Sequence, residues 1–495
     1  MGSNRSHRLI DTFQKYFGSS LDEQLTPQST PEYAALNLFH KAAARVPAYA
    51  RFLDERGINP GSIGTIDDFR LLPAITKDNY IQQHPLADLC WNGELGDFIA
   101  VSSGSTGEPT YWPRFQSDEL NTTTRFEQVF HDSFRADERN TLAVICFALG
   151  TWVGGMYTTA SCRHLAAKGY RITIVTPGNN KNEILRVVGD LAPQFEQTVL
   201  LGYPPFLKDV IDSGILSGLD WKPLRIKLVT AGEVFSEEWR NLIGERTGSD
   251  DELHDSASLY GTADAGVIGN ETPLSICIRR YLASNPENAK SLFGESRLPT
   301  LVQYDPTSRY FEVQEGRLLI TGDSGVPLVR YNILDSGGVI PFDEMLAFLS
   351  ARSFDPRAEL AGSRGVRPMP FVYVFGRSHF AVSYFGANIY PENVMVGLEQ
   401  RGIREWVTGK FVLEVKHDAD ENPFLSVTVE MATGEEPSER RAKAAAASIR
   451  TQLERLNSEF ANYAPAEYRT PKITLLPTGE PEWFPVGVKH RYTRA

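Results

Sequence analysis

Residues 101–115 read Val-Ser-Ser-Gly-Ser-Thr-Gly-Glu-Pro-Thr-Tyr-Trp-Pro-Arg-Phe, and this stretch is the most informative in the chain. It follows a short apolar run at 98–101. Gly104 and Gly107 remove side chains where backbone must approach a ligand closely. No Gly-Lys-Ser/Thr follows at the spacing of a Walker loop. The stretch therefore predicts a phosphate-binding loop of another kind, with a plain surface loop as the alternative. Hydroxyl and amide groups in this stretch can surround phosphate oxygens. They belong to Ser102, Ser103, Ser105 and Thr106.

Length and composition restrict the class of protein. The chain has 495 residues, of which 41% are hydrophobic and 23% charged, so we expect a folded protein with more than one domain. The formal net charge of -12 disfavours non-specific binding to nucleic acid or to a membrane surface. No apolar run reaches the ~20 residues of a membrane span, and no secretory signal is recognisable. The four cysteines are far apart, which indicates neither a zinc site nor a disulfide framework. We therefore expect a cytoplasmic protein without nucleic-acid or membrane partners.

The middle of the chain alternates between two patterns. An amphipathic helix is predicted over 32–46. From about 120 to 300, short β-branched-rich runs alternate with helical ones, which predicts βαβ units on a mainly parallel sheet. The expected strands are 142–147, 171–175, 198–201 and 226–230, and the expected helices are 154–168, 181–191, 205–213 and 236–247. Strands around turns are expected at 311–313, 317–321 and 328–331.

A second, smaller unit begins near residue 376. Strands are expected at 410–415, 425–431 and 472–476. A long helix is expected from Pro437, which suits a first turn. Its apolar stripe, which would pack on the small sheet, comprises Ala445, Ile449, Leu453, Leu456 and Phe460. The prediction is an α/β fold with a large N-terminal domain (1–375) and a small α+β C-terminal domain (376–495).

Further motifs lie before and after the glycine-rich loop. They are Leu-Pro-Ala-Ile-Thr-Lys-Asp-Asn-Tyr at 72–80, Ala-Gly-Glu at 231–233, Tyr-Gly-Thr-Ala-Asp at 260–264, Pro-Leu-Val-Arg-Tyr-Asn-Ile-Leu-Asp at 327–335, Gly-Arg-Ser at 376–378 and Gly-Ala-Asn-Ile-Tyr-Pro-Glu at 386–392. Together with the loop, and in this order, they resemble the motifs of the adenylate-forming enzymes. Thr110 points to the phenylacetate–CoA ligase-like branch. The resemblance covers roughly residues 32–495.

The resemblance implies a two-step ligase. ATP and Mg²⁺ would convert a carboxylic acid, of an aryl or arylacetic type, into an acyl adenylate. The acyl group would then pass to coenzyme A. One alternative acceptor is an amine, as in an amide synthetase, or a carrier-protein thiol. A second alternative is a relative that binds nucleotide or acid without turnover. A homodimer stays open.

Roles for individual residues follow from the resemblance. Asp335 would accept hydrogen bonds from both ribose hydroxyls, and the alternative is a plain turn residue. Arg330 aligns with a family arginine, and the alternative for it is a structural ion pair. Asp264 would bind the metal through one carboxylate, and a plain turn residue is the alternative. The remaining nucleotide-binding candidates are Ser103, Gly104, Ser105, Thr106, Gly107 and Thr110 for the phosphates, and Ala231, Gly232, Glu233, Tyr260, Gly261 and Thr262 for the nucleoside.

The acyl pocket is expected between strand ends and the helices that follow them. Gly154 and Gly155 would let a flat group approach a helix start, and aromatic rings can stack on such a group. The candidate aromatic residues are Phe147, Trp152 and Tyr203. Plain core packing is the alternative for each of them.

The chain departs from the family pattern at several positions. Glu108 stands where a lysine is common, Asp264 replaces a glutamate, and Ile333-Leu334 replaces Thr-Gly, which predicts a different local turn. His379, followed by Phe380, replaces the aspartates of the domain hinge. The catalytic tail lysine is displaced by one position, so Lys489 is the candidate, with His490 and Arg491 as competitors.

Overall fold

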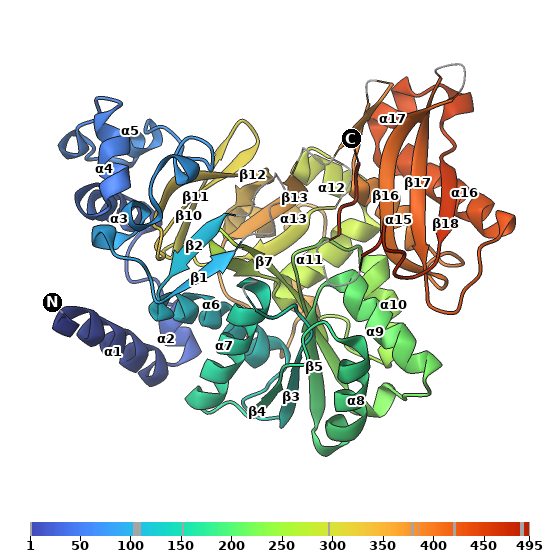
Figure 1. The fold of residues 1–495 in the computed structure, drawn as a ribbon, viewed down its shortest axis with the longest axis horizontal. Coiled ribbons are helices and arrows are strands. Elements are labelled where there is room, and N and C mark those ends of the chain that lie inside the picture. The colour runs from blue at the N-terminus through green and yellow to red at the C-terminus, as the bar shows by residue number, and fades with distance from the viewer. Residues whose placement is uncertain are drawn as a thin grey trace. The chain divides into compact units, whose positions relative to one another are not determined.

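The computed structural model describes residues 2–101, 110–150, 153–295, 298–377, 381–385, 387–418, 422–485 and 490–494. The chain divides into two compact units. Unit 1 comprises residues 1–178, 257–276 and 300–376, and unit 2 comprises 179–256, 277–299 and 377–495. Figure 1 shows their helices and strands. Among the described residues, no helix is both long and apolar enough to cross a bilayer.

Unit 1 begins with helices. The predicted helix at 32–46 is confirmed as α3, because Thr30 caps it by accepting a hydrogen bond from the Tyr33 amide and Pro31 occupies its first turn. Helix α1 was not predicted, and it is anchored where the Tyr16 hydroxyl donates to the Glu127 carboxylate at 3.0 Å. The helices of this part are α1 (Gly2–Gly18), α2 (Leu21–Leu25), α3 (Pro31–Arg45), α4 (Pro47–Asp54), α5 (Ile66–Arg70) and α6 (Gln116–Gln128).

The predicted βαβ pattern is confirmed in unit 1. Strand β3 (Thr141–Ile145), helix α7 (Val153–Lys168) and strand β4 (Ile172–Val175) form one βαβ unit, and the two strands pair in parallel. Every residue of β3 is buried, as expected for a strand covered on both faces. Two β-branched-rich runs separated by a helix thus form the predicted parallel pair.

The rest of unit 1 is largely antiparallel. Its strands follow the order β10-β11-β12-β13-β9-β8-β7, and the registered neighbours β10/β11, β11/β12, β13/β9 and β7/β8 run antiparallel. This agrees with the expected strands around turns at 311–331. The bounds are β7 (Ser256–Thr262), β8 (Gly266–Asn270), β9 (Thr300–Gln303), β10 (Arg309–Gln314), β11 (Arg317–Gly322), β12 (Leu328–Ile340) and β13 (Phe371–Arg377), with helices α13 (Phe342–Ser350) and α14 (Pro356–Glu359).

Unit 2 contains a second parallel pair. Strands β5 and β6 pair in parallel with Thr198 opposite Ile226, and α9 connects them. Helix α8 has the bounds that the sequence predicts, because Asn180 caps it by accepting from the Glu183 amide. The elements are α8 (Lys181–Leu191), β5 (Gln197–Gly202), α9 (Pro204–Leu216), β6 (Ile226–Ala231), α10 (Glu237–Thr247) and α12 (Pro286–Phe293); α11 (Pro273–Ser284) begins in unit 1 and ends in unit 2. The α/β fold class is confirmed.

The C-terminal part of unit 2 is an α+β arrangement. Strands β16 (Val407–His417), β17 (Pro423–Met431) and β18 (Lys472–Leu476) form a three-stranded sheet in that order. The other elements are β14 (Val382–Tyr384), β15 (Ala387–Ile389), α15 (Pro391–Leu398), α16 (Glu439–Leu456) and α17 (Ser458–Tyr463). Gly397 lets α15 approach α16, because a Cβ there would lie 2.6 Å from the Ile449 Cα.

Two details of the predicted long helix are wrong. The helix begins at Glu439 with Ser438 as its cap, so Pro437 lies before the cap rather than in the first turn. It ends at Leu456, and Asn457 starts the separate helix α17 that carries Phe460. Four residues of the stripe, Ala445, Ile449, Leu453 and Phe460, lie together in one buried core, whereas Leu456 at the end of α16 is only partly buried and lies outside it.

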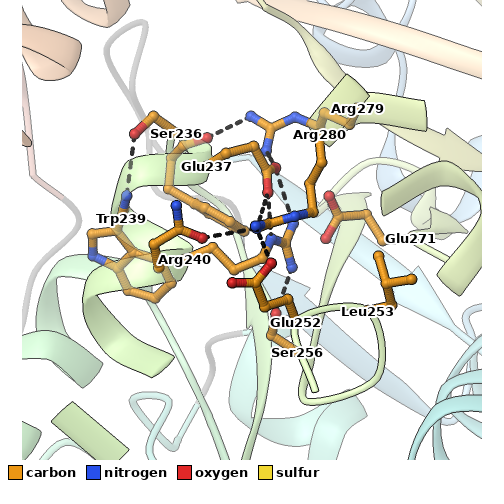
Figure 2. A network of polar contacts seen from close by, with 12 residues as sticks. Ser236, Glu237, Trp239, Arg240, Glu252, Leu253, Ser256, Glu271, Arg279 and Arg280 are labelled. Atoms are coloured by element: carbon orange, nitrogen blue, oxygen red, sulfur yellow. Dashed lines mark hydrogen bonds and ion pairs between the residues drawn. The ribbon is translucent and has the colours of Figure 1, made fainter. Parts of the chain in front are cut away.

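A buried ionic network holds the start of α10. Figure 2 shows the Glu237 carboxylate among the guanidinium groups of Arg240, Arg279 and Arg280. Burial alone would raise the pKa of Glu237, but the three guanidinium charges hold it below its usual value. Arg279 also donates to the Phe235 carbonyl oxygen at 2.5 Å. The network therefore fixes the segment that leads from β6 into α10.

Glu399 should make stability depend on pH. The Ser236 hydroxyl contacts this carboxyl at the end of α15, and burial raises its pKa to about 8. Because the unfolded value is near 4.5, the folded chain holds an extra proton between the two values. The free energy of unfolding should therefore fall by about 3–4 kcal/mol as the pH rises from about 5 to about 8.

Glu399→Gln tests this dependence because it keeps a neutral side chain of the same shape. Urea unfolding at several pH values should show a flatter curve for the variant than for the unmodified protein. Parallel curves would show that Glu399 titrates as an ordinary carboxyl.

Candidate functional site

The glycine-rich loop connects two strands of a hairpin in unit 1. Strand β1 (Phe98–Val101) pairs antiparallel with β2 (Tyr111–Arg114), and Val101 lies opposite Tyr111. Thr110 is the first described residue after the loop. The loop residues named as phosphate-binding candidates, together with Glu108, lie outside the described residues: Ser103, Gly104, Ser105, Thr106 and Gly107. Their roles stay predictions.

The Asp264 carboxylate is buried and held from two sides. Its Oδ2 accepts from the Tyr331 hydroxyl at 2.6 Å, and its Oδ1 lies 3.3 Å from the Lys77 ammonium. The side chain is only 3% exposed. Asp264 sits in the tight turn between β7 and β8, where the Thr262 hydroxyl accepts from the Ala265 amide at 3.1 Å. A plain turn residue would not need a buried carboxylate with an ammonium partner.

Two further segments meet at this carboxylate. Ile75 forms a parallel bridge with Tyr331, and the Asn332 amide donates to the Ile75 carbonyl oxygen at 2.9 Å. This places the motif at 72–80 beside β12. Arg114, the last residue of β2, donates to the carbonyl oxygens of Ala263 and Asp264 at 2.7 and 2.6 Å. Motifs far apart in the sequence therefore converge on Asp264.

Asp335 lies on β12 and pairs with another candidate. Its Oδ2 accepts from the Tyr260 hydroxyl at 2.8 Å, and both residues are buried. Asp335 is part of the strand itself, so it is not a turn residue ahead of the following glycines. A carboxylate can accept several hydrogen bonds, and Tyr260 fixes its orientation. Ribose binding by Asp335 stays a prediction.

The backbone before Asp335 carries local strain. Leu334 has a φ of 67°, the left-handed region that glycine occupies without cost. The Leu334 amide donates to the Asn332 side-chain oxygen at 2.9 Å, which supports this bend. The chain thus turns here without the Gly that the family pattern places at this position.

Arg330 is engaged in structural contacts. Its Nε lies 3.0 Å from a Glu312 carboxylate oxygen, and its guanidinium donates to the Leu72 carbonyl oxygen. This is the ion pair named as the alternative in the sequence analysis. A nucleotide-binding role for Arg330 stays a prediction.

The Ala-Gly-Glu motif lies at the end of β6 in unit 2. Ala231 is the last residue of the strand, and Gly232 has a φ of 82°. A Cβ at Gly232 would lie 2.7 Å from the Tyr203 ring, so the glycine lets this ring approach the backbone. Burial, together with the Glu233 charge, raises the pKa of Tyr203 to about 12. Adenine binding at this strand end stays a prediction.

Sequence reasoning missed a partner of Glu233. The Tyr492 hydroxyl donates to the Glu233 Oε2 at 2.6 Å. The sequence pattern of the tail indicates cations that could meet a phosphate, and no local pattern marks a tyrosine as the partner of a residue 259 positions earlier. Only the tertiary structure reveals this contact.

The acyl-pocket candidates divide between the units. In unit 1, Phe147 is buried and Gly154 lies near the start of α7. Gly155 has a structural reason to be glycine, since a Cβ there would lie 2.3 Å from the Ala148 carbonyl oxygen. Tyr203 belongs to unit 2, and Trp152 lies outside the described residues. Pocket membership stays a prediction for all of them.

The hinge and tail candidates are only partly described. His379 and Lys489 lie outside the described residues. His490 Nε2 lies 2.7 Å from the Phe411 carbonyl oxygen, and burial lowers the pKa of His490 to about 4. The imidazole is therefore neutral near pH 7.

The donor set at Asp264 fits a magnesium ion that also binds a polyphosphate. Mg²⁺ commonly takes one or two carboxylates and completes its shell with waters and phosphate oxygens. Across the part of the chain that the structure describes, no group of three His, Cys, Asp or Glu side chains could hold a metal alone. A metal-binding role for Asp264, whose two oxygens contact Lys77 and Tyr331, stays a prediction.

Lys77→Met should destabilise the folded state by leaving the buried Asp264 carboxylate without its cation. The free energy of unfolding should fall by about 2–4 kcal/mol. Adding Asp264→Asn should recover much of the loss, because the uncompensated charge is then gone. Urea unfolding of the single and double variants measures both effects.

Lys443→Met is the matched control, because the ion pair of Lys443 with Glu439 is largely exposed. It should leave stability unchanged. A double variant as unstable as Lys77→Met would show that the ammonium acts by packing and not by charge.

Known proteins resemble this chain in sequence. No family model matches it. The chain is 23% identical to the phenylacetate-coenzyme A ligase of Thermus thermophilus over 354 residues, which cover 71% of this chain and 70% of that protein. It is 22% identical to the phenylacetate-coenzyme A ligase of Escherichia coli over 399 residues, 79% of each chain.

Solved structures resemble it in fold. A 2-hydroxyisobutyryl-CoA ligase in the postadenylation state, in complex with R3-HIB-AMP, superposes with a TM-score of 0.66 at 15% identity, covering 95% of this chain and 90% of that one. The same ligase with 2-HIB-AMP and CoA in its thioesterification state gives a TM-score of 0.53 at 15% identity, with the same coverage. The resemblance inferred from the motifs is therefore confirmed: the chain is similar in sequence to phenylacetate–CoA ligases and has the fold of an adenylate-forming CoA ligase.

Proposed function

We propose that this chain is an AMP-forming ligase that activates a carboxylic acid with ATP and transfers the acyl group to coenzyme A. The observation that carries the proposal is the convergence of separate motifs on two buried carboxylates in unit 1. Lys77 and Tyr331 hold Asp264, and Tyr260 holds Asp335. The similarity to phenylacetate–CoA ligases supports the same reaction type.

In the first half-reaction, a carboxylate oxygen of the acid attacks the α-phosphorus of ATP. The bond from that phosphorus to the bridging oxygen breaks, and pyrophosphate leaves. The enzyme must hold two anions together and stabilise the charge that grows on phosphorus. A Mg²⁺ ion at Asp264 supplies part of that positive charge when it is bound.

The motif resemblance assigns the ribose and the adenine to separate motifs. In unit 1, Asp335 accepts hydrogen bonds from the ribose hydroxyls, oriented by Tyr260, with Gly261 and Thr262 beside it. In unit 2, the strand end of Ala231, Gly232 and Glu233 receives the adenine. A carboxylate fixed by a neutral tyrosine hydroxyl remains an acceptor, which is what a diol needs.

The phosphates are bound by the loop and by a tail cation. Ser103, Gly104, Ser105, Thr106, Gly107 and Thr110 supply hydroxyl and amide donors. Lys489 supplies the charge for adenylation, with Arg491 as the competitor. His490 is the weaker candidate, since burial lowers its pKa to about 4 and leaves the imidazole neutral.

The acid is of an aryl or arylacetic type. Phe147, Trp152 and Tyr203 offer rings for stacking, and Gly154 opens the start of α7.

In the second half-reaction, the CoA sulfur attacks the acyl carbon and AMP leaves. The mobile domain at 376–495 would turn about His379 relative to the domain at 1–375. The enzyme would act in the cytoplasm, and a homodimer stays compatible with this scheme.

A panel of carboxylic acids with ATP and Mg²⁺ tests the reaction. Pyrophosphate release should depend on an aryl-type acid, and acyl-CoA should form only when CoA is added. Adenylate that accumulates with CoA but is consumed by an added amine would favour an amide synthetase. Absence of pyrophosphate release across a broad panel would favour a binding protein without turnover.

Asp335→Ala should weaken ATP binding severely. The loss of two charge-assisted hydrogen bonds in a buried site costs about 2–4 kcal/mol, which raises the ATP KM by about 30-fold or more. Tyr260→Phe should have a smaller effect, because the carboxylate remains. Steady-state kinetics on both variants measure the difference, and an unchanged ATP KM in folded Asp335→Ala would remove Asp335 from the site.

A further inference from the structure

The tail of the chain is attached to the edge strand β16. The Leu413 amide donates to the Tyr492 carbonyl oxygen at 2.8 Å, and the Arg494 amide donates back to the Leu413 carbonyl oxygen at 3.3 Å. Leu413 and Thr493 form a parallel bridge. Residues 490–494 therefore follow β16 in a defined register, and this register fixes where the Tyr492 side chain lies.

The Tyr492 ring is held by aromatic contacts. Its centroid lies 4.9 Å from that of Phe411 and 4.6 Å from that of His490, with the latter pair nearly perpendicular at 86°. From this position the hydroxyl reaches Glu233 Oε2 at 2.6 Å. Burial, together with the Glu233 charge, raises the pKa of Tyr492 well above its usual value. The phenol thus keeps its proton and acts as a donor at any ordinary pH.

The hydrogen bond from Tyr492 restricts the orientation of the Glu233 side chain. It follows Gly232, whose φ of 82° turns the chain at the end of β6. A glutamate side chain has several rotatable bonds, and fixing them before a ligand arrives lowers the entropic cost of binding. A hydrogen bond to a carboxylate is charge-assisted and stronger than one between neutral groups. A carboxylate that accepts one hydrogen bond retains capacity for another donor, such as the exocyclic amine of adenine.

We propose that Tyr492 is a positioning residue for nucleotide binding: its hydroxyl fixes the Glu233 carboxylate and so couples the tail on β16 to the adenine end of the site. The proposal rests on the proposed function, since it takes Glu233 as part of the nucleotide site. The tail would then contribute to nucleotide binding through the Tyr492 hydroxyl as well as through the cation that the proposed function assigns to it. Reciprocity follows from linkage, so bound nucleotide must also stabilise the attachment of the tail.

Binding of AMP alone, measured by isothermal titration calorimetry, tests the coupling without turnover. Tyr492→Phe keeps the ring and removes only the hydroxyl. It should weaken AMP binding about 3–10-fold, which is the effect of one hydrogen bond. Glu233→Gln should weaken binding at least as much. The double variant should bind no more weakly than Glu233→Gln alone, because Tyr492 acts through Glu233.

Tyr463→Phe is the matched control. Tyr463 lies in the same C-terminal part of the chain, is 57% exposed, and its loss of a hydroxyl should leave AMP binding unchanged. Circular dichroism of each variant checks that it is folded. AMP binding by Tyr492→Phe equal to that of the unmodified protein would overturn the proposal. Effects of the two single variants that multiply in the double variant would overturn it as well.

Hydrogen exchange supplies a readout that a merely structural role would not change. The Leu413 amide, bonded to Tyr492, should exchange more slowly when AMP is bound, and this protection should be lost in Tyr492→Phe. AMP-dependent protection that persists in the variant would contradict the proposal. An unmodified protein that binds neither AMP nor ATP would refute the proposed function together with this inference. Tight AMP binding with no effect of Tyr492→Phe would refute the inference alone.

Discussion

Unit 1 is organised around the buried carboxylate of Asp264. An ionised carboxylate inside a protein is costly unless charge and hydrogen bonds compensate it. Here Lys77 supplies the charge and the Tyr331 hydroxyl supplies the hydrogen bond. Arg114 binds the carbonyl oxygens around the same turn. One buried anion therefore fixes the entry segment, the hairpin after the glycine-rich loop and β12 relative to one another.

Nearby groups compensate buried charge in the same way after the end of β6 in unit 2. Glu237 is a second buried carboxylate, compensated by three arginines, and Arg279 ties it to the Phe235 backbone. Glu233 lies only four residues earlier and is held by Tyr492. Glu233 and Glu237 thus each have defined partners. Such preorganisation lowers the conformational cost of binding a nucleotide.

Local sequence signals predicted those elements whose ends are capped by nearby residues. Helix α8 agrees because Asn180 caps it, and β18 agrees because its apolar run is short and bounded. The same reasoning placed Pro437 inside a helix, although Ser438 offers the better cap and excludes it. Helix α1 was not predicted because the hydrogen bond that anchors it joins Tyr16 to Glu127, more than a hundred residues away in the sequence.

The sequence by itself determined the family resemblance, the α/β class and the identity of Asp264, Asp335 and Glu233 as candidates, because motif order and local periodicity are properties of the linear chain. Only the tertiary structure decided their partners. Lys77 and Tyr331 reach Asp264 from separate segments, and Tyr492 reaches Glu233 from the tail. The physical reason is that burial and charge compensation depend on which side chains meet in space, and the sequence distance between two residues does not encode that meeting.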